Sequence, residues 1–154
     1  VRFGLQDDTS KYDSHHEYIT AMRSQWFWEE TQRRILLWTY SLSSENFDNY
    51  YKKAQKVRAK ISQKFEQFFC DYDIVIWPTS PVVAWKIWSK SEPLSNYMAD
   101  IYTVSANLCG LPAMSVPVGT VADQWDQMPV WLQMIASHWR EDLLFQVWKK
   151  IENL

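Results

Sequence analysis

A long apolar stripe that leads into a buried strand is the feature that most restricts the fold of this chain. Apolar residues recur at steps of three and four over residues 47–69, which predicts one face of a helix. The apolar segment 73–77 follows and predicts a buried strand. It ends at residues 78–81, Pro-Thr-Ser-Pro, a rigid loop that cannot continue the interior of a sheet. This region therefore predicts a helix that leads directly into a sheet.

The rest of the chain alternates the same two kinds of element. Helical periodicity marks four further segments, and short apolar runs mark three more strands. The predicted helices are 16–25, 29–42, 94–108 and 141–153, and the predicted strands are 1–5, 113–118 and 130–136. Helices that alternate with short apolar strands favour an α/β layered architecture.

Composition excludes several function classes. A net charge of −2 argues against a strongly basic nucleic-acid surface, although local patches are compatible with it. Cys70 and Cys109 have no paired spacing, so neither a disulfide framework nor a zinc site is expected. With 3 Gly the chain has no phosphate-binding glycine loop. No apolar run reaches the roughly 18 residues that span a bilayer. We expect no metal site and no membrane segment.

Two charged residues lie inside apolar helical segments. Arg34 stands beside Ile35, and Asp100 stands between Ala99 and Ile101. One interpretation is a structural ion pair or a solvent-facing side chain at each position. The other is a site for an amino acid, because one acid and one guanidinium suit an ammonium and a carboxylate.

Five sequence blocks then resemble, in order, the C-terminal part of a known family. The blocks are RRILLWTYSLS (33–43), DNYYKKAQKVR (48–58), PTSP (78–81), YMADIYTVSANLCGLPA (97–113) and VWLQ (130–133). They are similar to the A subunit of the glutamyl-tRNA(Gln)/aspartyl-tRNA(Asn) amidotransferases, within the amidase signature family. The YYKKAQKVR block favours this tRNA-dependent enzyme over other amidase-signature hydrolases.

The resemblance implies a fold and an activity. The fold is the C-terminal part of an amidase-signature domain, with a mixed sheet core covered by helices, and residues 1–154 form one fragment of that single domain. The activity is glutamine hydrolysis, with ammonia passed to a second subunit that converts Glu-tRNA(Gln) to Gln-tRNA(Gln). The implied partners are glutamine, the B and C subunits, and tRNA through the complex, in the bacterial cytoplasm. ATP and magnesium are expected in the partner subunit, and no cofactor is expected in this chain.

The resemblance also assigns the two charged residues. Arg34 falls where the family holds the glutamine carboxylate, and Asp100 falls where it holds the α-ammonium. Arg33 is expected to be structural or solvated. The family's catalytic Ser, cis-linked Ser and Lys lie in a Ser/Gly-rich segment upstream of the matched blocks. We therefore expect no catalytic residue in this chain and an inactive isolated fragment.

Two other functions stay open. One is an amidase-signature hydrolase for a hydrophobic amide, although such a substrate offers neither Arg34 nor Asp100 a charge. The other is a non-catalytic relic or scaffold module. A row of lysines also has two interpretations. Lys52, Lys56, Lys60 and Lys64 form either a solvated face or a contact for tRNA phosphate.

Tryptophan replaces glycine systematically. The chain has 10 Trp. The family has glycine at Trp26, Trp28, Trp38, Trp88 and Trp131, and Trp77 is a sixth candidate. Indoles at glycine positions predict backbone strain and a disrupted core. We weigh two origins: real divergence, or UGA codons that encode glycine but are read as tryptophan. Trp85 and Trp139 stand where the family has aromatic residues.

Overall fold

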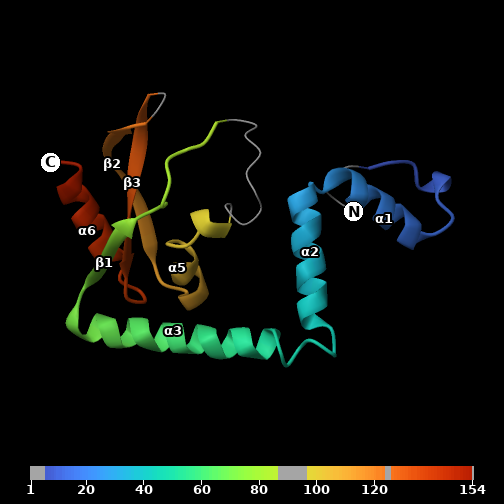
Figure 1. The fold of residues 1–154 in the computed structure, drawn as a ribbon, viewed down its shortest axis with the longest axis horizontal. Helices are drawn as coiled ribbons and strands as arrows, with labels where there is room; N and C mark the ends of the chain where they lie inside the picture. Colours follow the sequence, from blue (N-terminus) through green and yellow to red (C-terminus); the bar gives the residue numbers. More distant parts are fainter. Residues whose placement is uncertain (1–5, 87–96, 124–125, 154) are drawn as a thin grey trace. The chain divides into compact units, whose positions relative to one another are not determined.

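The structure, a computed structural model, describes residues 6–86, 97–123 and 126–153 and divides into two units. The first unit is Val1–Gln55 and the second is Lys56–Leu154. The predicted strand 1–5 and Trp88 lie outside the described residues. Figure 1 shows the elements of both units in chain order.

The first unit is helical. Its elements are η1 (Thr9–Lys11), α1 (His15–Trp26) and α2 (Glu29–Leu42). Ser14 caps α1, because its hydroxyl oxygen accepts the backbone N–H of Glu17 at 3.1 Å. Within this unit Tyr18 and Met22 are the buried hydrophobic side chains among the described residues. The predicted helices 16–25 and 29–42 are confirmed.

A three-stranded antiparallel sheet lies at the centre of the second unit. Its strands are β1 (Ile74–Pro78), β2 (Ala113–Ala122) and β3 (Gln127–Ala136), in the order β1-β3-β2. Ile135 pairs with Val75 on one side and with Ala113 on the other, which fixes β3 as the central strand. The three strands that the sequence predicts in this region are confirmed, and β2 extends beyond the predicted end at residue 118.

The extension of β2 passes through a proline and a bulge. Pro117 pairs with Trp131 and Gly119 with Val130, so one residue of β2 is unpaired between them. Because β2 is an edge strand, Pro117 needs no ladder partner on its outer side. Gly119 has φ +131°, a conformation that glycine adopts without steric cost.

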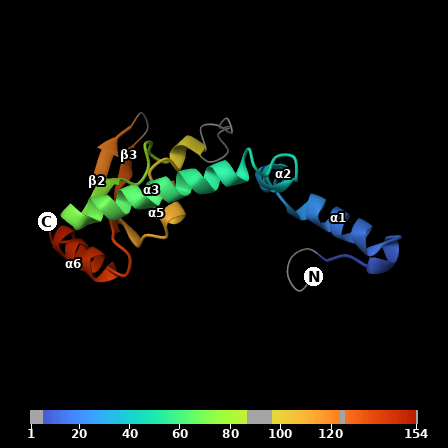
Figure 2. The ribbon, with the colours of Figure 1, turned by 90° about the horizontal axis from the view of Figure 1, so that it is seen from below.

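Helices cover both faces of the sheet. These are α3 (Tyr51–Asp71) and α5 (Val104–Cys109) on one face and α6 (Glu141–Ile151) on the other, as Figures 1 and 2 show. Ile135 of β3 packs in a cluster with Ala106, while its neighbours Met134 and Ala136 pack in a second cluster with Leu144. The alternation of side chains along β3 thus supplies two cores. This arrangement confirms the predicted α/β class.

Only half of the predicted apolar stripe reaches a core. Ile61, Phe65 and Phe69 of α3 pack against the cluster around Ile135, whereas Tyr50 and Val57 are exposed. The helix also begins at Tyr51 instead of residue 47, because residues 44–50 form turns. The periodicity predicted the apolar face of the helix correctly, but it did not show that only residues 61–69 of that face pack on a core.

The predicted helix 94–108 is wrong as one continuous element. Residues 97–99 are helical, residues 100–103 form a turn, and α5 covers Val104–Cys109; residues 94–96 lie outside the described part. In the turn the carbonyl of Asp100 accepts the backbone N–H of Thr103 at 3.1 Å and its hydroxyl at 3.2 Å. Hydrogen-bonded turns at residues 100–103 thus separate residues 97–99 from α5.

The expected strain at the tryptophans is also absent from the described positions. Trp26, Trp28, Trp38 and Trp131 are 51, 83, 62 and 47% exposed, so none of these four residues belongs to the buried core. Among the described non-glycine residues, positive φ occurs at Trp139 instead, with φ +63°. The predictions of strain and core disruption are therefore wrong for these four residues, and the origin of the substitutions stays a hypothesis.

Candidate substrate pocket

A cavity of about 790 Å³ opens beside the sheet of the second unit. Its walls come from the loop after β1, the turn before α5, and the facing ends of β2 and β3. The lining residues are those of 78–85, Ala99, Asp100, Thr103, Val118, Val121 and those of 129–132. Most of these side chains are apolar, so a ligand in this cavity would lose much of its water shell.

The loop after β1 is fixed to the sheet by two hydrogen bonds. The backbone N–H of Thr79 donates to the carbonyl oxygen of Trp131 at 2.9 Å. The hydroxyl oxygens of Thr79 and Ser115 lie 2.7 Å apart and share a second hydrogen bond. The loop therefore continues the pairing of β1 with β3 for one residue and then turns away as one wall of the cavity.

Asp100 supplies the charge of the cavity. Of the described residues that line it, Asp100 alone has a carboxyl or basic side chain. The backbone of Asp100 is anchored, because its carbonyl accepts from Val104 at 3.0 Å and its N–H donates to Tyr97 at 3.3 Å. Within the described part of the chain, the structure gives its carboxylate no hydrogen-bond or ion-pair partner.

This arrangement suits a cationic group on an otherwise apolar or uncharged ligand. Asp100 is exposed, so water weakens its attraction for an ammonium, while the neighbouring apolar walls strengthen it. The hydroxyls of Thr79 and Ser80 add hydrogen-bonding groups at the same cavity. Among the described residues, no group of three or more His, Cys, Asp or Glu side chains is placed to hold a metal ion.

Arg34 lies in the first unit, on α2. Its Nε donates to Oε1 of Glu30 at 3.0 Å, one helical turn earlier, and its side chain is 53% exposed. Arg33 forms ion pairs with Glu29 and Glu30, which fits the structural part expected of it. The two predicted substrate-binding residues thus belong to different units, and the structure gathers only Asp100 into the cavity.

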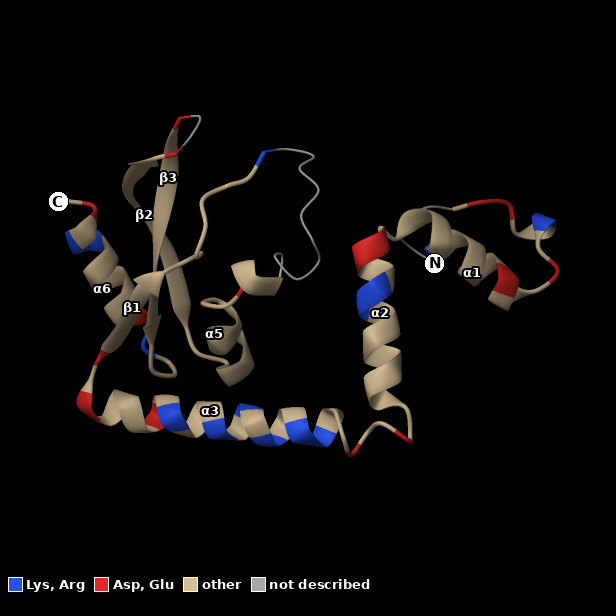
Figure 3. Cartoon of the chain, viewed as in Figure 1, with Lys and Arg blue, Asp and Glu red and all other residues tan. Residues whose placement is uncertain are grey.

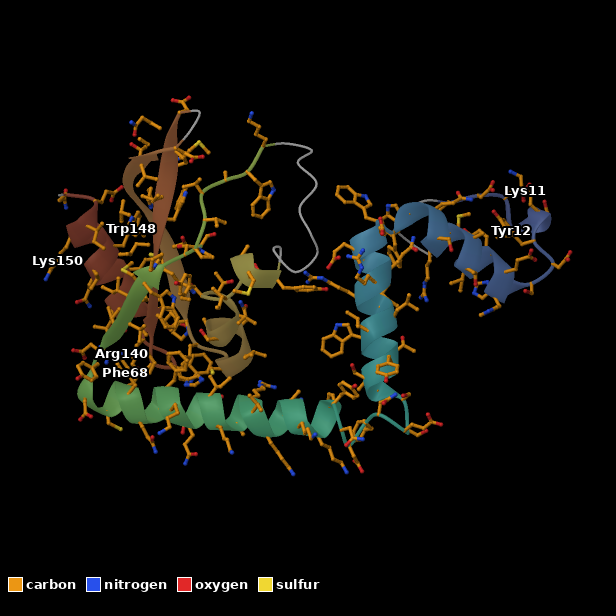
Figure 4. The ribbon with its side chains drawn as sticks, viewed as in Figure 1. Lys11, Tyr12, Phe68, Arg140, Trp148 and Lys150 are labelled. Carbon is orange, nitrogen blue, oxygen red and sulfur yellow. The ribbon has the colours of Figure 1, made fainter. Side chains whose placement is uncertain are left out.

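Two exposed ion pairs outside the cavity shift the pKa values of their members. The hydrogen bond from Lys11 lowers the pKa of the Asp7 carboxyl, with a smaller contribution from Tyr12. The hydrogen bond from Arg140 lowers the pKa of Asp142 in the same way. Lys11, Tyr12 and Arg140 are labelled in Figure 4. Neither pair lines the cavity, so we interpret both as structural.

Of the residues that line the cavity, the sequence-based prediction of the site contains only Asp100. Thr79, Thr103 and Trp131 are among those that it lacks. A loop between two prolines, directly after a predicted strand, is a common position for binding residues and could have drawn attention to Thr79. Trp131 lies on a strand predicted as core, and only the folded structure places it among the residues that line the cavity.

The family of the chain follows from comparison with known proteins. The profile of the amidase family, described as "Amidase", matches residues 2–145. The chain therefore belongs to the amidase family, as the sequence blocks predicted.

The more similar relatives share one name, that of the A subunit of glutamyl-tRNA(Gln) amidotransferase. The protein of that name from Lacticaseibacillus casei is 51% identical over 148 residues, which is 96% of this chain and 29% of the relative. The protein from Akkermansia muciniphila is 48% identical over 131 residues, 84% of this chain and 28% of the relative. The chain thus spans less than a third of the length of the curated relatives it matches.

Solved structures agree with this assignment. The crystal structure of the glutamyl-tRNA(Gln) amidotransferase A subunit from Thermotoga maritima is 42% identical, with a TM-score of 0.56, and the match covers 79% of this chain and 26% of that one. The structure of 6-aminohexanoate cyclic dimer hydrolase is 26% identical, with a TM-score of 0.50, and covers 72% of this chain and 24% of the other. The amidase-signature fold that the sequence predicted is confirmed.

Proposed function

We propose that this chain forms the glutamine-binding side of the protein that hydrolyses glutamine in a tRNA-dependent amidotransferase. In this proposal the α-ammonium of glutamine pairs with Asp100 and the α-carboxylate pairs with Arg34. Ammonia released from the side-chain amide passes to a second subunit, where it converts Glu-tRNA(Gln) to Gln-tRNA(Gln).

The observation that carries the proposal is the position of Asp100. It is the charged residue among those that line the cavity, and no described side chain neutralises it. A cavity of about 790 Å³ accommodates an amino acid with room to spare. Thr79, with its hydroxyl, stands on another wall of the same cavity.

Arg34 fits the proposal through its chemistry. A guanidinium presents a planar fork of donors, so it binds a carboxylate by two parallel hydrogen bonds. Nε of Arg34 is engaged with Glu30, and more than half of the side chain is exposed.

The proposal extends to partners and cofactors. The catalytic serines and lysine of the reaction are to be supplied from outside residues 1–154, so residues 1–154 alone are expected to be inactive. ATP and magnesium belong to the partner subunit, while the B and C subunits complete the complex that receives tRNA. None of the described helices combines the length and apolar character needed to cross a bilayer. We place the complex in the bacterial cytoplasm.

A second candidate is an amide hydrolase with a less polar substrate. The apolar lining of most of the cavity and the similarity to 6-aminohexanoate cyclic dimer hydrolase favour it. Asp100 counts against a fully apolar substrate, because such a ligand would cover an exposed carboxylate and offer it no partner.

The test uses the full-length protein in the assembled amidotransferase complex. Asp100→Asn and Arg34→Ala should each raise the KM for glutamine roughly 10- to 100-fold, the cost of a charge-assisted hydrogen bond. Activity with free ammonia should stay near wild type, because ammonia bypasses this site. The matched controls are Asp123→Asn, outside the cavity, and Arg33→Ala, beside Arg34 on the same helix. Equal loss of both activities in Asp100→Asn would contradict the proposal.

A further inference from the structure

The lysine row of α3 is a feature that the proposed substrate site does not use. We call Lys52, Lys56, Lys60 and Lys64 the lysine face. All four side chains are exposed. With a rise of about 1.5 Å per residue, the lysine face extends over roughly 18 Å of the helix. Figure 3 shows the basic residues concentrated along α3.

Packing on the opposite side of α3 fixes the outward direction of the lysine face. Ile61, Phe65 and Phe69 pack on the sheet, and Nε of Arg58 donates to the carbonyl of Leu108 at 2.6 Å. Residues at steps of four from Lys52 to Lys64 lie on the other side of the helical wheel. The core of the second unit therefore holds Lys56, Lys60 and Lys64 away from itself.

The lysine face is concentrated positive charge with little neutralisation. Residues 51–65 contain six Lys or Arg and no Asp or Glu, although the whole chain has a net charge of −2. Lys52 pairs with Asp48 at 2.6 Å, while no ion pair within the described residues engages Lys56, Lys60 or Lys64. Like charges four residues apart destabilise a helix by about 0.2–0.5 kcal/mol per pair. A polyanionic partner would relieve this repulsion.

We propose that the lysine face binds the phosphate backbone of the tRNA that the amidotransferase serves. This inference rests on the proposed function. Lysine ammonium groups on flexible stems bind phosphates as point charges and carry no sequence specificity. The contact would thus hold the tRNA in position without reading its bases.

A protein partner fits the lysine face less well. On the same side of the helix lie Ala59, Gln63 and Gln67, and the exposed Val57 lies beside Lys60, three residues away. A lone valine is a weak anchor, because binding hot spots are enriched in Trp, Tyr and Arg, and lysine itself is depleted from protein interfaces. Charge complementarity to a polyanion is therefore the property that the lysine face offers.

The experiment measures tRNA affinity of the assembled complex as a function of salt. The variant is Lys60→Gln with Lys64→Gln. The control is Lys149→Gln with Lys150→Gln, which removes the same charge from the exposed end of α6, where Glu152 lies nearby. Lys150 is labelled in Figure 4. Size-exclusion chromatography checks assembly, and glutaminase activity without tRNA checks the substrate site.

The expected result is a loss of tRNA affinity for the α3 variant alone. Two lost phosphate contacts should lower the slope of log affinity against log salt by about 1.5 and weaken binding on the order of tenfold. Equal affinities of the α3 variant and the control would overturn the proposal. Weaker assembly would also overturn it if the complex that still forms keeps its tRNA affinity, since that result assigns the lysine face to a protein partner. Glutaminase activity should be unchanged in both variants, so failure here is distinct from failure of the substrate site.

Discussion

The two units differ in how they treat their apolar side chains. Among the described residues the first unit buries two hydrophobic side chains, Tyr18 and Met22, whereas the second buries eight. The apolar residues of α2 are mostly exposed: Ile35, Leu36, Leu37, Trp38, Tyr40 and Leu42. The second unit is organised around β3, which presents side chains to helices on both faces. Helical periodicity occurs in both units, but in the second unit the sheet provides a surface on which the apolar helix faces pack.

The largest expected difference comes from a matched isoleucine pair. Ile135→Ala in the second unit should destabilise the chain by about 2–5 kcal/mol, because Ile135 is fully buried and its loss leaves a cavity. Ile35→Ala in the first unit should cost about 0.5 kcal/mol or less, since Ile35 is 43% exposed. Urea unfolding followed by circular dichroism measures both. Similar costs would contradict the contrast between the units.

A glutamine pair should give the next effect. Gln133 is buried, and its Oε1 accepts the indole N–H of Trp77 at 3.1 Å. Gln133→Leu leaves that N–H without a partner and should cost about 1–3 kcal/mol. Gln32 of the first unit donates to the carbonyl of Phe27 at 2.8 Å. Gln32→Leu should cost about 1 kcal/mol or less, because water can reach a part-buried carbonyl. The same unfolding experiment would contradict this ranking if Gln32→Leu were the more costly change.

Two positions with left-handed backbone in the second unit should give smaller changes in stability, of opposite direction. Gly110 and Trp139 both have left-handed backbone, with φ +67° and φ +63°. A Cβ at Gly110 meets no atom within 4 Å, so Gly110→Ala should cost about 1 kcal/mol through the backbone alone. Trp139 is 88% exposed, and Trp139→Gly should stabilise the chain by up to about 1 kcal/mol. Thermal unfolding midpoints should move in opposite directions, and a lower midpoint for Trp139→Gly would contradict the account.

The smallest expected effects are on the stability of the chain at low pH. They involve one carboxylate in each unit. The pKa of Asp7 is lowered by Lys11 and that of Asp142 by Arg140, so each carboxylate ionises more readily in the folded chain. Each contribution is present above the unfolded pKa of about 4 and is lost as pH falls through the folded value. Asp7→Asn and Asp142→Asn should therefore each flatten the fall in midpoint temperature between about pH 5 and pH 2. An unchanged pH profile in both variants would show that these ion pairs do not contribute.

Much of the fold could be predicted from hydrophobic periodicity, because each predicted element has a local pattern. The helix 29–42 and the strands 73–77 and 130–136 needed no knowledge of their neighbours. The turn at residues 100–103 could not be predicted in this way, since Ile101 and Thr103 fit a helical pattern as well as a turn. The same holds for β2, which continues past Pro117 only because it lies at the edge of the sheet.

One charged residue of the cavity was predictable from the sequence, but the residues that form its walls were not. Asp100 could be singled out as a carboxylate among apolar neighbours, and the structure places it at the cavity. Thr79 and Trp131 come together through the pairing of β1 with β3, a contact between segments far apart in sequence. The exposure of the tryptophans was likewise not predictable. A glycine at the same position in a related sequence does not show whether that position is buried or exposed to solvent.

The pairing of Asp100 with an α-ammonium is the central claim, and substrate discrimination tests it most directly. The full-length protein in its complex should be assayed with glutamine and with the monoamide of glutaric acid. This compound keeps the carboxylate and the amide of glutamine but lacks the α-ammonium. The wild type should prefer glutamine in kcat/KM by roughly 10- to 100-fold. Asp100→Asn should lose this preference mainly through a poorer reaction with glutamine. If Asp100→Asn retains the full preference for glutamine, Asp100 does not bind the ammonium and the claim is wrong.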